Sequence, residues 1–363
     1  MTPTPTILLA RGTSIGRGQP CFLVAEIGNN HQGDEATARE MISRAADAGA
    51  DAVKFQKRDT AALLTRAGRE APYGGPNSFG PTYGAHREAL ELPLDALARL
   101  KNHAESLGLV FFASAWDAPS LDGLASLGLE LIKIASADLT TVPLLRQAGS
   151  LGIPLVLSTG MSAMQEIAAA VGELRALRTP LVLLHCNSSY PCPECDAALP
   201  VMTELGQRFN LPVGYSGHEA GLAPSLGAVA LGACMVERHF TLDRTLPGTD
   251  HRASLDPESF ALLASMVREL ERALRVRDKL VTPAERATAA KLRKSVVAAR
   301  PIAPGTVLNE ADLTVKCPGT GISPLHWDEL LGRTALRALV PDEQLCWSDV
   351  SPAAGAAKAG AGA

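Results

Sequence analysis

"PLVLSTGMSAMQEIAAAVGELRALRTPLVLLHCN", residues 154–187, contains one complete unit of the fold. Its two ends, 154–160 and 181–187, are short apolar runs rich in Val and Leu, which is typical of strands buried in a parallel sheet. Between them, apolar residues recur three and four positions apart, and this spacing predicts an amphipathic helix. The segment therefore predicts a strand, a helix and a second, parallel strand.

The same alternation recurs along the chain. Stretches such as 35–50 carry the helical spacing and separate apolar runs of strand length. The candidate strands are residues 21–28, 51–57, 109–115, 129–136, 154–160, 181–187, 212–218 and 234–240. Eight strand–helix units within roughly 250 residues predict a closed (β/α)8 TIM barrel, which belongs to the α/β class.

The sequence changes character after the predicted barrel. Residues 295–313 and 334–350 share a pattern of strand, Pro with Gly or Asp at a turn, then Leu and a later Asp. This pattern predicts a small β-rich domain with weak internal repetition. The C-terminal segment consists of small residues that bury too little surface to offset their ordering entropy. The predicted divisions are the barrel (1–278), a charged linker (279–293), the small β-rich domain (294–350) and a disordered tail (351–363).

The overall charge argues against nucleic acid or membrane as a partner. A formal net charge of -4 provides no basic surface for a polyanion, so an anionic ligand has to be bound by locally placed cations. The N-terminal apolar patch is followed at once by Arg11, and no stretch approaches the ~20 apolar residues of a membrane span. We expect a soluble protein that acts on a small metabolite.

The cysteines indicate a reducing compartment. There are seven, an odd number without the spacing of a disulfide framework, and most lie in apolar runs. We therefore expect a cytoplasmic protein. Cys192 and Cys195 form one C-x-x-C pair, which is either a coincidence in a loop or a redox or metal site.

Polar side chains occur at the C-terminal end of almost every predicted strand. They are Glu26, Lys54, Ser114, Lys133, Ser136, Ser158, His185, Ser188, Ser216, His218, Glu237 and His239. In a barrel these ends converge on one mouth, where such enzymes carry their active sites. Any one of these residues, taken alone, is more often a strand-end residue that faces solvent. Their recurrence on successive strands favours a functional site.

Two histidines suggest a metal site. His218 and His239 end the seventh and eighth predicted strands, which are neighbours around a barrel. Their imidazoles can meet at one divalent ion, and two ligands leave positions open for water and substrate, as in a catalytic site. The alternative for each is a hydrogen-bonded core histidine.

Two lysines suggest an anion site. Lys54 and Lys133 lie in apolar strand ends, where an unpaired ammonium would cost several kcal/mol. With neighbouring hydroxyls they could bind a phosphate or carboxylate through charge-assisted hydrogen bonds. The hydroxyls are those of Ser136, Ser158 and Ser216. The alternative is a structural ion pair of each lysine with Glu26 or Glu237.

Two carboxylates are acid–base candidates. Glu26 ends the first strand and could transfer a proton or orient a water. Alternatively, the loop that follows it only shapes a turn, with Asp34 capping the next helix. Asp250 lies in a loop after the eighth strand and is the second acidic candidate.

Several of these motifs together resemble the sialic acid synthase family. They are "PCFLVAEIGNNHQGD", "KFQK", "NSFGPTYGAHREALEL", "KIASADLT", "LSTGM", "GYSGHEAG", "VERHFTLD" and "GTDHRASLDP". The later "RKSVVAARPIAPGTVLNEADLTVKCPG" resembles the antifreeze-like (SAF) domain that ends those proteins. The resemblance covers nearly the whole chain apart from the tail.

The resemblance implies a reaction and its participants. The expected enzyme is a transferase that condenses phosphoenolpyruvate with N-acetylmannosamine or its 6-phosphate, giving N-acetylneuraminate or its 9-phosphate plus phosphate. A divalent metal, Mn²⁺ or Mg²⁺, assists. The family forms a domain-swapped homodimer in which each small domain covers the barrel of the other subunit, and we expect the same here.

The resemblance also implies roles for residues at matching motif positions. The metal ligands would be His218 and His239. Phosphoenolpyruvate would be bound by Lys54, Lys133, Ser136, Ser158, Ser188 and Ser216. The sugar would be faced by Gln56, Tyr190, Asp138 and Asp250. The catalytic carboxylates would be Glu26, Asp250 and Asp138.

One departure concerns the sugar. Cys317 stands where bacterial members usually have an arginine that reaches the N-acetyl group from the partner subunit. A synthase of a related nonulosonic acid, such as legionaminic, pseudaminic or deaminated sialic acid, is therefore the first alternative. A non-catalytic sugar-binding protein is the second, and it predicts loss of the histidines and lysines that this chain retains.

Overall fold

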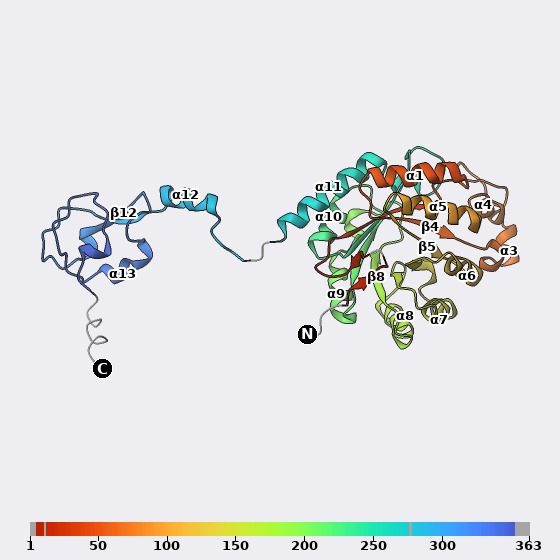
Figure 1. Ribbon diagram of the computed structural model, residues 1–363, viewed down its shortest axis with the longest axis horizontal. Helices are drawn as coiled ribbons and strands as arrows, with labels where there is room; N and C mark the ends of the chain where they lie inside the picture. Colours follow the sequence, from red (N-terminus) through yellow and green to blue (C-terminus); the bar gives the residue numbers. More distant parts are fainter. Residues whose placement is uncertain (1–4, 11, 276–277, 353–363) are drawn as a thin grey trace. The chain divides into compact units, whose positions relative to one another are not determined.

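Eight parallel strands close into a barrel, as predicted (Figure 1). This computed structural model describes residues 5–10, 12–275 and 278–352. The strands in chain order are β3 (Phe22–Gly28), β4 (Ala52–Lys57), β5 (Val110–Ala115), β6 (Ile132–Ile134), β7 (Leu155–Ser158), β8 (Leu181–Cys186), β9 (Val213–Gly217) and β10 (Met235–His239). Pairing of β10 with β3 closes the barrel, and His239 lies opposite Glu26 in that register.

Helices follow the strands and form the outer layer. They are α1 (Glu35–Asp47), α5 (Leu94–Ser106), α6 (Ala118–Ser126), α7 (Val142–Ser150), α8 (Met164–Ala176), α9 (Pro200–Phe209), α10 (Ala223–Ala230) and α11 (Pro257–Ala273). Three short helices, α2 (Thr60–Leu63), α3 (Arg66–Glu70) and α4 (Tyr83–Ala89), extend the connection after β4. Asp34 caps α1 as predicted, because its carboxylate accepts from the Thr37 N–H at 2.7 Å.

The barrel has two apolar layers. One lies between strands and helices, and the other fills the barrel from the end opposite the mouth. A hairpin of β1 (Ile7–Leu8) and β2 (Ser14–Ile15) contributes to this inner layer, where Ile7 and Ile15 pack with Phe22 and Phe112. The N-terminal patch is therefore part of the core, which the sequence pattern did not predict.

The chain divides into two compact units, Met1–Arg275 and Val276–Ala363. In the second unit, β11 (Ser295–Ala298) and β12 (Leu313–Lys316) form an antiparallel pair. Two further helices are α12 (Pro283–Leu292), within the segment predicted as a linker, and α13 (Trp327–Leu330). The tail predicted at 351–363 falls, from residue 353 onward, outside the described residues.

The predicted repetition in the second unit has a structural counterpart. The Nε of Arg300 donates to Asp312 Oδ1 at 2.7 Å, and the Nε of Arg337 donates to Asp349 Oδ1 at 2.7 Å. Each pair spans 12 residues, and each aspartate also accepts from a backbone N–H three residues earlier. The two halves of this unit therefore share the same arginine–aspartate hydrogen bond and the same aspartate–backbone contact.

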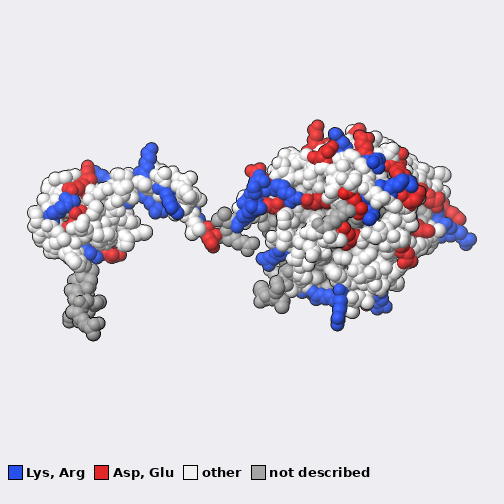
Figure 2. Space-filling view, in the orientation of Figure 1, with Lys and Arg blue, Asp and Glu red and all other residues white. Residues whose placement is uncertain are grey.

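The surface carries both charge signs. Figure 2 shows Lys and Arg side chains intermixed with Asp and Glu over the visible face of the barrel unit. This mixing of charges is consistent with the small net charge of -4. Because the visible surface of the described residues has no large basic patch, an anionic ligand would need cations placed inside a site. No helix in the described part of the chain is both long and apolar enough to cross a lipid bilayer.

Candidate active site at the barrel mouth

A buried ionic network fills the mouth of the barrel. Lys54 Nζ lies 2.7 Å from Glu26 Oε2 and 3.9 Å from Glu237 Oε2. Lys133 Nζ pairs with the other oxygen of Glu237, which also accepts from Ser216 Oγ at 3.1 Å. All five side chains are nearly inaccessible to solvent. The structure therefore brings the predicted lysines together with both carboxylates.

Glu237 is the centre of this network. Burial would raise its pKa, but the ammonium groups of Lys133 and Lys54 outweigh burial and keep the pKa below its ordinary value. Burial lowers the pKa of Lys54, and Glu237 and Glu26 oppose that shift. The sequence placed Glu237 among the strand-end residues of the mouth and as an alternative ion-pair partner of the lysines, without a role in the reaction. A substrate anion would have to share the lysines with it.

Hydroxyl groups form a small cradle beside this network. Ser136 Oγ accepts from the Gly160 N–H at 3.0 Å. A Cβ at Gly160 would lie 2.4 Å from Ser188 Oγ and 2.9 Å from Ser136 Oγ, so only glycine fits there. Ser158 Oγ is buried and has no hydrogen-bond partner among the described residues. An unpaired buried hydroxyl costs about 1–3 kcal/mol, which is typical of a group that awaits a ligand.

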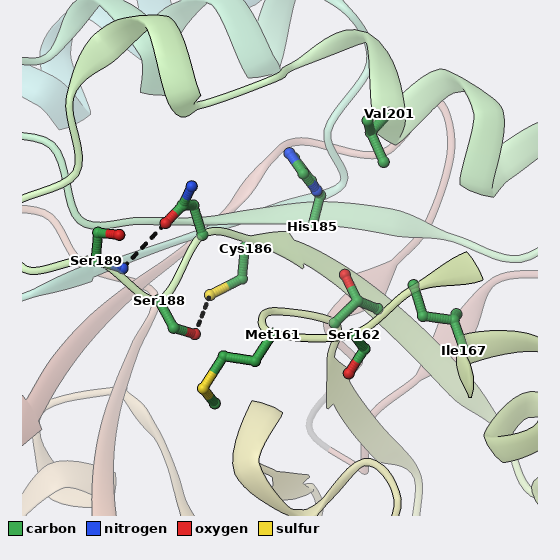
Figure 3. A pocket seen from close by; sticks show the side chains of 10 residues that line it. Met161, Ser162, Ile167, His185, Cys186, Ser188, Ser189 and Val201 are labelled. Carbon is green, nitrogen blue, oxygen red and sulfur yellow. Dashed lines mark hydrogen bonds between the residues drawn. The ribbon is translucent and has the colours of Figure 1, made fainter. Parts of the chain in front are cut away.

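The cradle adjoins a cavity of about 410 Å³ (Figure 3). Figure 3 shows Cys186 beside Ser188, with Met161 nearby on the opposite wall; the Cys186 Sγ and Ser188 Oγ are 4.0 Å apart. His185 turns away from the barrel mouth, and its Nε2 lies 2.8 Å from the Ala197 carbonyl oxygen. Its predicted convergence with the other strand-end residues was therefore wrong, because it lies on the outward face of β8.

The two predicted metal ligands lie side by side. The ring centroids of His218 and His239 are 5.4 Å apart. His218 Nδ1 is 2.6 Å from the Asn187 carbonyl, which can only accept, so Nδ1 carries the proton and Nε2 keeps its lone pair. Burial and the neighbouring His239 lower the pKa of His218 to about 3. A neutral imidazole is the form that binds a metal.

His218 and His239 would supply only part of a metal coordination sphere. His239 Nδ1 is buried without a hydrogen-bond partner among the described residues, and Asp250 Oδ2 lies 3.8 Å from it. No group of three or more His, Cys, Asp or Glu side chains in the described ranges is arranged to bind a metal. Two imidazoles alone would leave most coordination positions of a divalent ion to water or substrate.

Two further predicted sugar-facing residues, Tyr190 and Gln56, lie close to the histidines. The Tyr190 ring lies 4.1 Å from that of His218, centroid to centroid. Gln56 Nε2 donates to Glu26 Oε1 at 2.6 Å. A Cβ at Gly28 would lie within 3.5 Å of Gln56, Glu26 and His239 alike, which shows that these three side chains converge.

Two aspartates differ in their ionisation. Burial, with a contribution from Asp117, raises the pKa of Asp138 to about 6, and its Oδ2 has no hydrogen-bond partner among the described residues. Burial opposes ionisation of Asp250, but His239 and the Thr249 hydroxyl outweigh it and lower its pKa. One carboxyl is therefore able to exchange a proton near neutral pH, and the other stays ionised.

Arg58 belongs to the site but was not predicted from the sequence. It is 3 % exposed, donates to the Gln56 Oε1 and to Asn29 Oδ1, and lies 4.3 Å from the Trp116 ring centroid. Glu91 neutralises it at 3.2 Å. The available signal was a basic residue directly after a predicted strand, "KFQKR".

The cysteines are all free thiols. Cys192 is buried, and its N–H donates to the His218 carbonyl at 3.0 Å, whereas Cys195 is exposed. Cys317 belongs to the second unit, where its thiol lies 3.3 Å from the Leu292 carbonyl oxygen. Cys192 therefore supports the backbone of a predicted metal ligand.

Comparisons with known proteins agree with this architecture. The NeuB family model matches residues 41–279, and the SAF domain model matches residues 293–351. The chain is 40% identical over 339 residues to the N-acetylneuraminate-9-phosphate synthase of Homo sapiens, covering 93% of this chain and 94% of that protein. It is 37% identical over 341 residues to the N,N'-diacetyllegionaminic acid synthase of Legionella pneumophila, covering 92% and 96%.

A solved structure shares the fold. The N-acetylneuraminic acid (sialic acid) synthetase of Leptospira borgpetersenii, in complex with citrate, superposes with a TM-score of 0.69 at 34% sequence identity. The match covers 78% of this chain and 95% of that chain. The matched region therefore includes most of the barrel that carries the site described above.

Proposed function

The chain belongs to the NeuB family and contains a SAF domain, and from this premise we propose that it condenses phosphoenolpyruvate with an open-chain N-acetylated amino sugar. The reaction forms a carbon–carbon bond and releases phosphate. The observation that carries the proposal is the juxtaposition, in one buried mouth, of a lysine–carboxylate network with two adjacent imidazoles. The first suits an anionic substrate, and the second suits a divalent ion.

Phosphoenolpyruvate would occupy the cradle and the lysine network. Its anionic groups would replace part of the interaction that Lys133 and Lys54 now make with Glu237 and Glu26. Hydroxyls would complete the site. These are Ser136, Ser158, Ser188 and Ser216. The unpaired Ser158 hydroxyl supports this assignment, because a substrate oxygen would satisfy it.

A divalent metal, Mn²⁺ or Mg²⁺, would be held by His218 and His239, with Asp250 at their side. When bound it would act as a Lewis acid that polarises the sugar aldehyde. Tyr190, beside His218, and Gln56, beside Glu26, would orient the sugar.

The chemistry then needs placed carboxyl groups. The enol carbon attacks the aldehyde carbon, water adds to the former C2 of the enol, and the C2–O bond to phosphate breaks, which yields a 2-keto acid and inorganic phosphate. Glu26 is held at both oxygens, by Gln56 and Lys54, and can orient that water or accept its proton. Asp138 is the candidate to protonate the alkoxide that forms from the aldehyde.

The proposal includes a domain-swapped homodimer in the cytoplasm. Family resemblance motivates the dimer, and the free thiols agree with a reducing compartment. Light scattering checks the dimer: a mass near twice 38.0 kDa is expected, and a monomeric active enzyme would contradict it.

A synthase of a related nonulosonic acid is the second candidate. One observation favours it: Cys317 occupies the place of an arginine expected to contact the N-acetyl group. The chain is 37% identical to a diacetyllegionaminic acid synthase, against 40% to an N-acetylneuraminate-9-phosphate synthase. A thiol cannot reproduce the charged, bidentate contact of a guanidinium.

Phosphate release tests both candidates. Phosphoenolpyruvate and Mn²⁺ would be combined with N-acetylmannosamine, its 6-phosphate, mannose or a 2,4-diacetamido sugar, and each assay repeated with chelator. Release with either form of N-acetylmannosamine, lost with chelator, is the expected result. Release only with the diacetamido sugar or mannose would select the second candidate. No release with any sugar would overturn the proposed reaction and favour a binding protein.

A further inference from the structure

A second buried ion pair lies directly behind the two histidines. Arg238 and Glu219 are each 0 % exposed, and Arg238 NH1 donates to Glu219 Oε1 at 3.1 Å. Arg238 precedes His239, and Glu219 follows His218. Because side chains alternate along a strand, the histidines face the mouth while this pair faces the helical layer.

The Arg238 guanidinium donates hydrogen bonds to backbone carbonyls of the loop that begins at His218. Its NH1 donates to the Gly221 carbonyl at 2.9 Å, and its NH2 donates to the Glu219 carbonyl. Glu219 is in turn fixed by Tyr215 OH at 3.0 Å and Ser225 Oγ at 3.1 Å. The strand carrying one histidine is thereby bonded, through a guanidinium, to the loop carrying the other.

Gly217 makes this arrangement possible. A Cβ there would lie 2.7 Å from Glu219 Oε2 and 2.7 Å from Tyr215 Cε1. Glycine lets Glu219 fold back against the outer face of its own strand, so that successive residues point to opposite sides. His218 consequently enters the mouth from a backbone that is fixed on its outer side.

Stability alone is a weak reason for such a pair. Removing two charges from water costs desolvation energy that offsets most of their mutual attraction. Well-packed apolar residues in their place often give a core of equal stability. What the charged pair provides is directional bonding between two backbone segments, and buried polar pairs are best attested as devices that fix register. The two segments fixed here each carry a candidate metal ligand.

We propose that Arg238 and Glu219 are positioning residues that set the separation of the His218 and His239 imidazoles, and with it the affinity for a divalent cation. This inference rests on the proposed metal role of the two histidines. Neither residue touches the mouth, so neither would be found by a search for residues in contact with substrate.

The test is a titration of the full-length protein with Mn²⁺, following free Mn²⁺ by electron paramagnetic resonance. The double variant R238M/E219M removes both charges and leaves no uncompensated ion. R238K keeps the charge but loses the planar fork, and it serves if the double variant fails to fold. Both are expected to bind Mn²⁺ at least tenfold more weakly than the wild type while retaining a cooperative thermal transition.

Two controls separate the possible failures. Arg268→Met removes another arginine–carboxylate pair, with Asp51 at 2.7 Å, near the end of the barrel opposite the mouth, and should leave Mn²⁺ affinity unchanged. His218→Ala should abolish the specific Mn²⁺ binding. If His218→Ala binds like the wild type, the metal assignment falls and this inference with it. If His218→Ala fails to bind but R238K and the double variant bind within twofold of the wild type, the positioning role alone is overturned.

Discussion

Lys133 and Glu237 form an ion pair inside the barrel mouth, and the two side chains are only 6 % and 3 % exposed. They are 104 residues apart in the sequence and lie on β6 and β10. Glu237 also faces Lys54 at 3.9 Å, but the nearer partner of Lys54 is Glu26 at 2.7 Å, so two nearly inaccessible carboxylates share two ammonium groups. Under the proposed function, a substrate anion would compete with Glu237 for Lys133 and with Glu26 for Lys54.

Glu237→Gln should destabilise the protein and make it respond more strongly to anions. Removing the carboxylate leaves the buried Lys133 without its carboxylate partner and Lys54 with Glu26 alone, which costs about 3 kcal/mol of unfolding free energy. Phosphoenolpyruvate should then raise the thermal midpoint of the variant more than that of the wild type, because it replaces the lost charge. Glu173→Gln is the matched control, since its partner Arg146 is 63 % exposed and such pairs contribute under about 1 kcal/mol. Equal destabilisation by the two substitutions would contradict the role of Glu237.

Asp138→Asn should stabilise the protein at neutral pH. The pKa of Asp138 is raised in the folded state to about 6, so the folded protein holds this proton more tightly than the unfolded chain does. Stability is accordingly lost as pH rises from about 4 to 6, and the loss persists above that window. The amide carries no charge, so the variant should gain about 2 kcal/mol over the wild type at pH 7 and nothing near pH 4. Urea unfolding at both pH values measures this, and a gain that is the same at both would refute the titration of Asp138.

The barrel could be predicted because its signals are local. Apolar spacing within residues 154–187 and its repeats needs no information from distant parts of the chain. The convergence of strand ends follows from the fold itself, which is why most of the predicted site residues meet at one mouth.

The errors have a different origin. "LVLLHCN" is apolar on both faces, so its composition does not reveal whether His185 or Cys186 faces the barrel interior, and a shift of one residue reverses the answer. The β1 and β2 strands are two residues each, too short to show any period. Arg58 enters the site through contacts with Asn29, Glu91 and Trp116 that only tertiary structure brings together.

Ser158→Ala should weaken substrate binding without weakening the fold. The Ser158 hydroxyl is buried and unpaired, so replacing it with a methyl-bearing side chain removes a penalty of about 1 kcal/mol rather than a bond. If the hydroxyl donates to phosphoenolpyruvate, the KM for that substrate should rise about tenfold. Ser120→Ala is the matched control, because the Ser120 Oγ is also buried and unpaired among the described residues but lies on α6, in the outer helical layer. A KM that changes equally in both variants would remove Ser158 from the substrate site.

Gly160→Ala should inactivate the enzyme while leaving it folded. The added Cβ would approach Ser188 Oγ to 2.4 Å and Ser136 Oγ to 2.9 Å, and both serine side chains would have to rotate out of the cradle. Loss of two charge-assisted contacts to phosphate, at about 1.5–3 kcal/mol each, corresponds to at least a hundredfold fall in kcat/KM for phosphoenolpyruvate. Gly172→Ala, in the exposed face of α8 with no atom within 4 Å of the new Cβ, should instead keep full activity and gain about 0.5–1 kcal/mol of stability. Steady-state kinetics and thermal unfolding of the two variants decide the matter, because near-normal kcat/KM in Gly160→Ala would mean that phosphate binds outside the hollow between Ser136 and Ser188.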